Sequence, residues 1–159
     1  MPFGNYTEAE TTDGSAYQGH RTLPADRPLV LFAFFETELA RMNLEFFIKH
    51  GLHDAADFMF VLNGETDAEK LIPKRPNIRY IKRGNDCYDM GAFAEVLIKN
   101  DLYKNYKRYI TLNSSIRGPF LPTWSDACWS ETYLNKITDS VKVRRRERCS
   151  CTCHNMLTL

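Results

Sequence analysis

Leu29-Val30-Leu31-Phe32-Ala33-Phe34 is an uninterrupted apolar run that directly follows Pro28. A strand with one face in water alternates apolar and polar side chains, whereas a strand that is covered on both faces is apolar throughout. The run is also short, which favours a strand over a helix. It therefore predicts a buried strand of the kind found in parallel sheets.

The segments after this run alternate between the two types of secondary structure. Apolar residues at helical spacing predict a helix over 36–50, with Thr37 as its N-cap and Gly51 just after its end. The remaining expected elements are strands at 57–63, 78–81 and 108–112, a helical turn within 67–72, a helix from Asp86, a loop and helix over 124–137, and a candidate fifth strand at 139–143. Alternating strands and helices predict an α/β fold: a mainly parallel, Rossmann-like nucleotide-binding sheet flanked by helices and incomplete at the C-terminus.

The first two helices each carry an apolar stripe that we expect to face the sheet. The stripe of the first helix comprises Leu39, Ala40, Met42, Leu44, Phe46 and Phe47, and that of the second comprises Met90, Phe93, Ala94, Leu97 and Ile98. Asp86 is a candidate N-cap of the second helix, with Asp89 three residues on, close to a capping box. Gly91-Ala92 would allow this helix to approach the sheet closely.

Composition fits one folded domain. The chain has 159 residues, of which 43% are hydrophobic and 26% charged, with a net charge of +1. We expect a disordered polar arm at 1–27, a domain at 28–143, and a basic, Cys-rich irregular tail at 144–159. Because the basic residues gather in the tail, the domain has no nucleic-acid-binding character. No signal peptide or membrane span is recognisable, so a cytoplasmic location is the default expectation.

The five cysteines do not form the pattern of a secreted disulfide framework. Cys149, Cys151 and Cys153 lie beside His154 in the tail. Structural zinc sites take ligands from C-x₂₋₄-C pairs on two separate elements, and consecutive C-x-C-x-C-H is cramped for one tetrahedral ion. We therefore expect no metal site here. The tail is interpreted as an unstructured end that follows a truncation or an altered reading of the gene.

Two polar clusters follow predicted strands. Their members are Asn85, Asp86 and Asp89 in the first cluster, and Asn113, Ser114, Ser115 and Arg117 in the second. In α/β sheets, ligands bind beyond the carboxyl ends of the strands, so we expect the two clusters to converge on one crevice. A carboxylate there can accept hydrogen bonds from ribose or sugar hydroxyls. Arginine is the preferred planar donor for phosphate oxygens.

Both clusters also have a purely structural interpretation, which the sequence leaves open. Asp86 and Asp89 can cap a helix and complement its dipole. Asn and Ser are ordinary turn residues. Glu36 and Glu38 follow the first strand, and a charge at a helix N-terminus accounts for Glu38, while the role of Glu36 stays open.

The order of elements and two motifs resemble the front half of GT-A glycosyltransferases, most closely the branch similar to rhamnan synthesis protein F. The motifs are Arg83-Gly84-Asn85-x-x-x-Asp89-x-Gly91-Ala92 and the segment 112–120, and the resemblance spans about residues 28–141. It implies the truncated N-terminal half of a hexosyl- or rhamnosyl-type transferase of polysaccharide biosynthesis. Its partners would be a nucleotide-sugar donor and a glycan or protein hydroxyl as acceptor. The donor-binding residues would be Asn85, Asp89, Asn113, Ser114, Ser115 and Arg117.

The sequence departs from that family at two points. The family's Asp-x-Asp triplet, which holds a divalent metal on the diphosphate, is here Asn113-Ser114-Ser115. Neutral oxygens bind Mg²⁺ or Mn²⁺ poorly, so Arg117 is expected to neutralise the diphosphate instead. The family's catalytic base and acceptor site belong to a second half, so no catalytic residue is named. An inactive fragment, a non-catalytic nucleotide- or sugar-binding module, and an α/β domain with merely capping loops all stay open.

Overall fold

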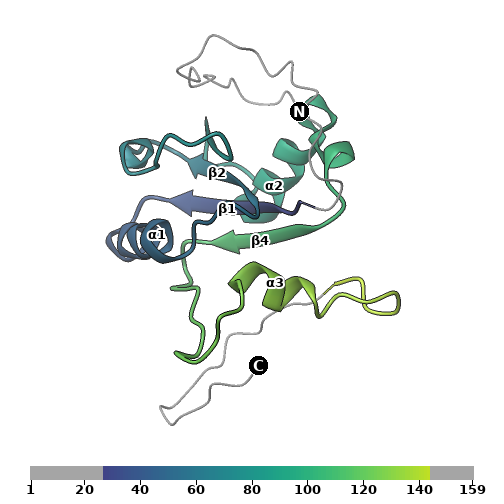
Figure 1. Ribbon diagram of the computed structural model, residues 1–159. Helices are drawn as coiled ribbons and strands as arrows, with labels where there is room; N and C mark the ends of the chain where they lie inside the picture. The colour runs from purple at the N-terminus through teal and green to yellow at the C-terminus, as the bar shows by residue number, and fades with distance from the viewer. Residues whose placement is uncertain (1–26, 144–159) are drawn as a thin grey trace, which may run out of the picture.

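Four strands and three α-helices follow one another along residues 27–143, the part of the chain that the computed structural model describes (Figure 1). The strands are β1 (Leu29–Phe35), β2 (Asp57–Asn63), β3 (Ile78–Arg83) and β4 (Tyr109–Asn113). The helices are α1 (Glu38–His50), α2 (Tyr88–Ile98) and α3 (Trp129–Leu134), with 3₁₀ turns η1 (Ala68–Lys70) and η2 (Lys99–Asn105). The expected arm, except for Arg27, and the expected tail with Cys149–His154 lie outside the described residues.

The four strands form one parallel sheet in the order β3-β2-β1-β4. This confirms the predicted α/β, Rossmann-like sheet. Within residues 27–143, the candidate fifth strand at 139–143 is wrong: the N–H of Thr138 donates to the carbonyl of Val141 over 2.9 Å. This segment closes on itself as a turn rather than pairing with the sheet. No helix of the described chain is long and apolar enough to cross a membrane.

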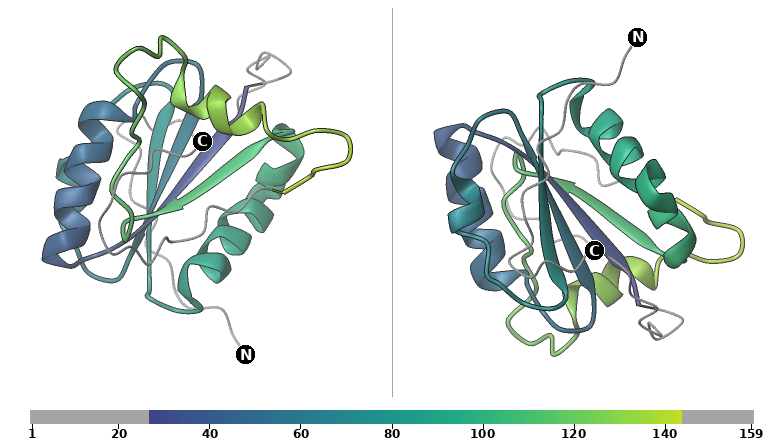
Figure 2. Two further views of the ribbon diagram at one scale, coloured as in Figure 1. Left: turned by 90° about the horizontal axis from the view of Figure 1, so that it is seen from below. Right: turned by 90° about the horizontal axis from the view of Figure 1, so that it is seen from above.

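β1 is the centre of the core, as its apolar run predicted. Val30, Phe32 and Phe34 face the cluster that packs under α1, while Leu31 and Ala33 face the cluster under α2. Figure 2 shows α1 and α2 on opposite sides of the sheet. Each large apolar side chain buried in this way contributes about 1.5–3 kcal/mol. The continuous apolar run is thus explained by a helix on each face of the strand.

α1 begins where the sequence indicated. The Thr37 side chain accepts a hydrogen bond from the N–H of Ala40 over 3.1 Å, which confirms the N-cap. The predicted stripe is too broad, however, because Leu39 and Met42 are 62% and 51% exposed. Ala40, Leu44 and Phe47 form the buried face, joined by a buried asparagine, Asn43.

α2 differs from its prediction at its start. Its N-cap is Cys87, in the left-handed conformation with φ 61°, and no side chain caps the helix. Asp86 is therefore not the cap. Met90 and Ile98, predicted to be buried, are 74% and 69% exposed, whereas Ala92, Phe93 and Val96 are buried. Ala92, Phe93 and Val96 form the side of the helix that packs on Leu31, Ala33 and Val61 of the sheet, and Met90 and Ile98 lie outside that side.

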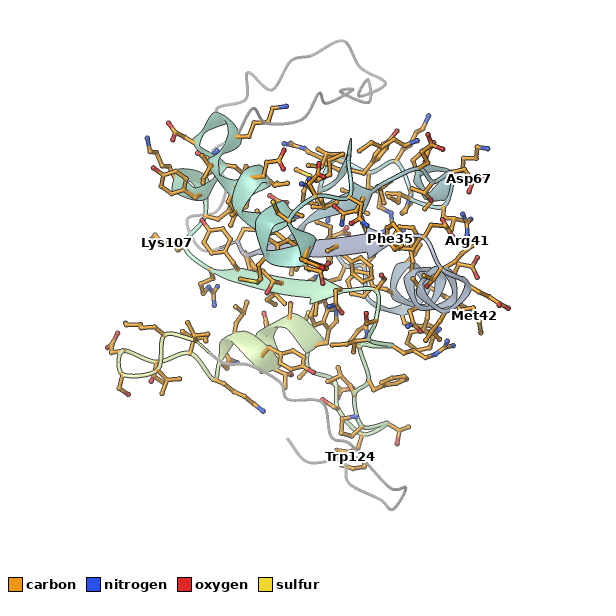
Figure 3. All side chains as sticks on the ribbon, turned by 180° about the vertical axis from the view of Figure 1, so that it is seen from behind. Phe35, Arg41, Met42, Asp67, Lys107 and Trp124 are labelled. Atoms are coloured by element: carbon orange, nitrogen blue, oxygen red, sulfur yellow. The ribbon has the colours of Figure 1, made fainter. Side chains whose placement is uncertain are left out.

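α3 closes the α1 side of the core. The indole N–H of Trp129 donates to the carbonyl of Gly51 over 2.7 Å, and its ring packs edge-on against Phe47. Gly51 is required here because a Cβ would lie 2.7 Å from the Phe47 ring. Trp124, at the start of the loop and helix expected over 124–137, is 78% exposed and lies in the loop before α3 (Figure 3).

Candidate functional site

The strand order creates a topological switch point between β1 and β4. The chain leaves β1 towards β2 and β3 on one side, and β4 lies on the other side. Loops that leave β1 and β4 therefore diverge, and the space beyond their carboxyl ends is where open α/β sheets bind ligands. Phe35 ends β1 and Asn113 ends β4 at this edge. Figure 3 shows Phe35 at this edge and Lys107 near the opposite one.

The two predicted clusters meet at one contact. The side-chain amide of Asn113 donates to Oδ2 of Asp89 over 2.8 Å. The parallel register pairs Asn113 with Ala33 and so places Asn113 on the α2 face of the sheet. Asp89 lies in the first turn of α2 and reaches the same place. Both side chains are half-buried.

Backbone contacts fix the loop that follows Asn113. The N–H of Ser114 donates to the carbonyl of Ala33 over 3.0 Å, which extends the pairing of β4 with β1 by one residue. The buried amide of Asn43 donates to the carbonyl of Ser114 over 2.9 Å. Ser114 is buried, so it serves this anchoring, whereas Ser115 is exposed. The site is therefore held by α1 and β1 as well as by β4.

Two amide oxygens at this position have no donor. Oδ1 of Asn113 and Oδ1 of Asn43 are buried, and neither has a hydrogen-bond partner within the described chain. Their orientations are fixed, because turning either amide would aim an oxygen at the Asp89 carboxylate or the Ser114 carbonyl. A buried acceptor without a donor costs free energy and is uncommon, so each such group calls for an explanation.

Arg117 and Asn85 do not touch the Asp89–Asn113 pair. The guanidinium of Arg117 lies over the ring of Phe46 on α1, 4.4 Å from the ring centre. It is therefore on the α1 side of the β4 exit, opposite Asp89. The exposed Asn85 lies beside Gly64, the residue that follows β2. A Cβ added to Gly64 would lie 3.8 Å from the Cβ of Asn85. The ring of Phe35 lies 3.4 Å from the same point.

Arg83 organises the loop between β3 and α2 and was missed as a structural centre. Its side chain, 5% exposed, donates to Glu95 Oε2 over 3.0 Å, to Asn63 Oδ1 over 2.8 Å and to the carbonyl of Asp86 over 2.9 Å. It thereby connects β2, α2 and the loop that precedes Asp89. The signal that could have indicated this role is a charged residue at the end of a strand, Arg83, followed by an acidic residue in the next helix, Glu95.

Glu36, whose role was left open, belongs to an ion-pair cluster. Arg41 binds both carboxylate oxygens of Glu36 over 2.8 Å and also contacts Asp67, while Thr66 donates to Glu36. The hydrogen bond between Arg41 and Glu36 is the largest cause of two shifts: it lowers the pKa of Glu36 and raises the pKa of Arg41. The hydrogen bond from Arg41 likewise lowers the pKa of Asp67. Figure 3 shows Arg41 beside Asp67. The cluster ties the loop after β1 to the loop after β2.

A hollow of about 260 Å³ opens at the opposite edge of the sheet. It is lined by Arg27, Pro28, Ala55, Arg108, Ser130, Glu131 and Leu134. None of the predicted site residues lines this hollow, and Arg27 is already ion-paired with Asp57 over 2.7 Å. Its lining mixes both signs of charge. The candidate site therefore stays at the carboxyl edge, where strand order and polar clusters coincide.

Within residues 27–143, no group of three or more His, Cys, Asp or Glu side chains is placed to hold a metal ion. At the Asp89–Asn113 contact, the donor set is the Asp89 carboxylate with neutral amide and hydroxyl groups, while Glu36 at the same edge is already bound by Arg41 and Thr66. Mg²⁺ and Mn²⁺ sites depend on carboxylate oxygens, so this donor set does not fit a dedicated site for either ion.

No family model matches the chain, and comparisons with curated proteins and with solved structures give no significant match. The case for a function therefore depends on the geometry of the carboxyl edge.

Proposed function

We propose that the carboxyl edge of the sheet binds a nucleotide-sugar donor and that the chain is a glycosyltransferase-like donor-binding domain. The observation that carries this proposal is the hydrogen bond between Asn113 and Asp89 at the β1/β4 switch point. It positions a carboxylate where parallel α/β sheets bind nucleotides. The resemblance of the two loops to the GT-A class supports the same substrate.

In this proposal, Asp89 accepts hydrogen bonds from the ribose hydroxyls. The Asn113 bond uses Oδ2, and Oδ1 has no hydrogen bond within the described chain, so it is available to a diol. A carboxylate that accepts a hydrogen bond from the ribose 2′-hydroxyl is a recurrent feature of dinucleotide sites on this kind of sheet. Asn85 and Ser115, both exposed at the same edge, supply further polar contacts to the donor.

Arg117 is assigned to the diphosphate. A guanidinium stacked on an aromatic ring keeps its N–H edge free, and that edge matches phosphate oxygens. Arg117 is exposed in the loop that follows β4, and in this proposal the diphosphate extends from the ribose towards α1 to meet it. In glycosyl transfer, positive charge at this position would stabilise the departing diphosphate.

A non-catalytic binding module is the second candidate. One observation favours it: the carboxylate identified at the site, Asp89, already accepts a hydrogen bond from Asn113 and is assigned to the ribose. In this reading the described residues would bind the donor, and none of them is assigned as a catalytic base.

Titration calorimetry with UDP, GDP, ADP and dTDP, each with and without Mn²⁺, tests the proposal. We expect one nucleoside diphosphate to bind with little dependence on metal. Hydrolysis or transfer of the matching nucleotide sugar would then separate an enzyme from a binding module. A folded sample that binds none of the four nucleotides contradicts the proposal.

A further inference from the structure

The loop before α2 has an unusual backbone. Cys87 and Tyr88 are consecutive, and both have positive φ angles, 61° and 51°. Non-glycine residues seldom adopt this left-handed conformation, because the side chain crowds the backbone, and a bulky aromatic residue is an outlier there. Strain of this kind persists where the surroundings enforce it, and it gathers at ligand sites.

One residue makes room for this conformation and another holds the loop in place. Gly91 donates its N–H to the carbonyl of Cys87 over 3.1 Å, and a Cβ on Gly91 would lie only 2.3 Å from the Cβ of Cys87. The absence of a side chain at position 91 is therefore what allows Cys87 to be left-handed. The buried Arg83 holds the same loop through the carbonyl of Asp86.

The turn leaves an exposed aromatic residue next to Asp89 in the chain, at the start of α2. Tyr88 is 91% exposed and directly precedes Asp89, which is bonded to Asn113 at the end of β4. Burying an aromatic ring is favourable, so a strained turn that keeps one in solvent gains nothing from the fold itself. An exposed ring can instead serve as a stacking surface for a flat ligand.

We infer that Tyr88 is the base-stacking residue of the donor site. This inference rests on the proposed function, in which Asp89 binds the ribose. The nucleobase is the group attached directly to that ribose, and Tyr88 is the exposed aromatic residue adjacent to Asp89 in the chain, so we assign the nucleobase to Tyr88. Stacking on the face of tyrosine accepts any base, and it leaves the choice of base to polar groups such as Asn85.

Calorimetry with three probes tests the inference: the nucleoside diphosphate that binds best, ribose 5-phosphate, which has no base, and the corresponding nucleotide sugar. The variants are Tyr88→Phe, which keeps the ring, and Tyr88→Asn, which removes it while tolerating the left-handed backbone. Trp124→Ala is the matched control, since Trp124 is also an exposed aromatic residue but lies in the loop before α3 (Figure 3).

Tyr88→Asn should weaken both base-containing probes about tenfold, the factor that corresponds to about 1.4 kcal/mol, and should leave ribose 5-phosphate unchanged. Tyr88→Phe and Trp124→Ala should bind all three probes like the wild type. Unchanged affinity of Tyr88→Asn for the nucleotide, or an equal loss for ribose 5-phosphate, overturns the stacking role alone. A wild-type protein that binds no nucleotide overturns the proposed function and this inference together.

Discussion

Asn113 and Asp89 are joined across the carboxyl edge of the sheet, amide nitrogen to carboxylate oxygen, at 2.8 Å. One ends β4 and the other lies in the first turn of α2, so the bond fixes a helix N-terminus relative to the strand next to the switch point. It also explains why a carboxylate at this position is half-buried and yet stable. The amide supplies a donor on one oxygen and leaves the other oxygen for a ligand.

Asp89→Asn should weaken nucleoside diphosphate binding by about tenfold or more, because a hydrogen bond to a charged group contributes about 1.5–3 kcal/mol. The substituted amide can still accept the Asn113 bond, so the fold should persist. Titration calorimetry measures the affinity. Asp101→Asn is the control, because Asp101 contributes only an exposed ion pair with Lys104. If Asp89→Asn binds the nucleotide as tightly as the wild type does, Asp89 does not contact the nucleotide.

Arg117→Ala should reduce affinity for the nucleoside diphosphate while leaving affinity for the nucleoside itself unchanged. The expected loss is about tenfold, since Arg117 is assigned one charge-assisted contact to phosphate. Arg117→Lys should recover part of it, because lysine keeps the charge but not the planar fork or the stacking on Phe46. If Arg117→Ala weakens the nucleoside equally, the residue acts through the Phe46 contact rather than on phosphate.

Gly91→Ala should destabilise the domain by about 1–3 kcal/mol, a typical cost of overpacking, because the new methyl would meet the Cβ of Cys87. Urea unfolding followed by circular dichroism measures this change. Cys87→Gly in the same chain should restore most of the stability by removing the clashing atom. Gly118→Ala is the control, since the nearest heavy atom to its Cβ would be 3.7 Å away. If the double variant is no more stable than Gly91→Ala, the cost of the new methyl group does not come from its contact with Cys87.

Arg83→Met should cost about 3 kcal/mol, because it leaves Glu95 and the buried Asn63 oxygen without their donor. The same urea experiment on Lys82→Met provides the comparison. Lys82 is the adjacent residue and pairs with Glu69 nearer the surface, so its loss should cost at most about 1 kcal/mol. Similar costs for the two variants would show that Arg83 is not the centre of the loop.

The sheet could be predicted from the sequence because the patterns that indicate it lie within short segments of the chain. An apolar run such as 29–34 reports burial on both faces directly, and the Thr37 cap depends on residues within one turn. The start of α2 was not readable, because it depends on a left-handed turn that Gly91 permits and Arg83 holds from a distance. Tertiary contacts overrode the local capping signal at Asp86.

Part of the site could be predicted because the ends of the strands are also local features of the sequence. Strand ends placed Asp89 and Asn113 at one edge, but only the register of β4 on β1 puts Asn113 on the α2 face, where it meets Asp89. Arg117 and Phe46 are far apart in sequence, and their stacking follows from how the β4 exit loop crosses α1. Side-chain partners across elements carry no local signature, so Asn43 and Arg83 were not predicted as parts of this edge.

Lowering the pH from about 7.5 to 5.5 should destabilise the domain through His53. Burial lowers the pKa of His53 below its ordinary value of 6.5; the Arg27 charge adds to this, and the Asp54 and Glu131 charges oppose it. Its Nδ1 accepts the N–H of Ala55, and its ring packs on Phe58. The unfolded chain therefore takes up the proton first, so this stability is complete above pH 6.5 and is lost as the pH falls towards the folded pKa.

His53→Asn removes this titration and keeps an oxygen that can accept the Ala55 N–H. The free energy of unfolding, measured in urea at pH 7.5 and 5.5, should then differ less between the two conditions than in the wild type. His50→Asn is the control, because it removes another histidine, one exposed at the end of α1, and leaves the His53 contacts in place. The His53→Asn variant lacks the imidazole that packs against Phe58. If it keeps the full pH difference, the loss of stability at low pH comes from other groups and the prediction is wrong.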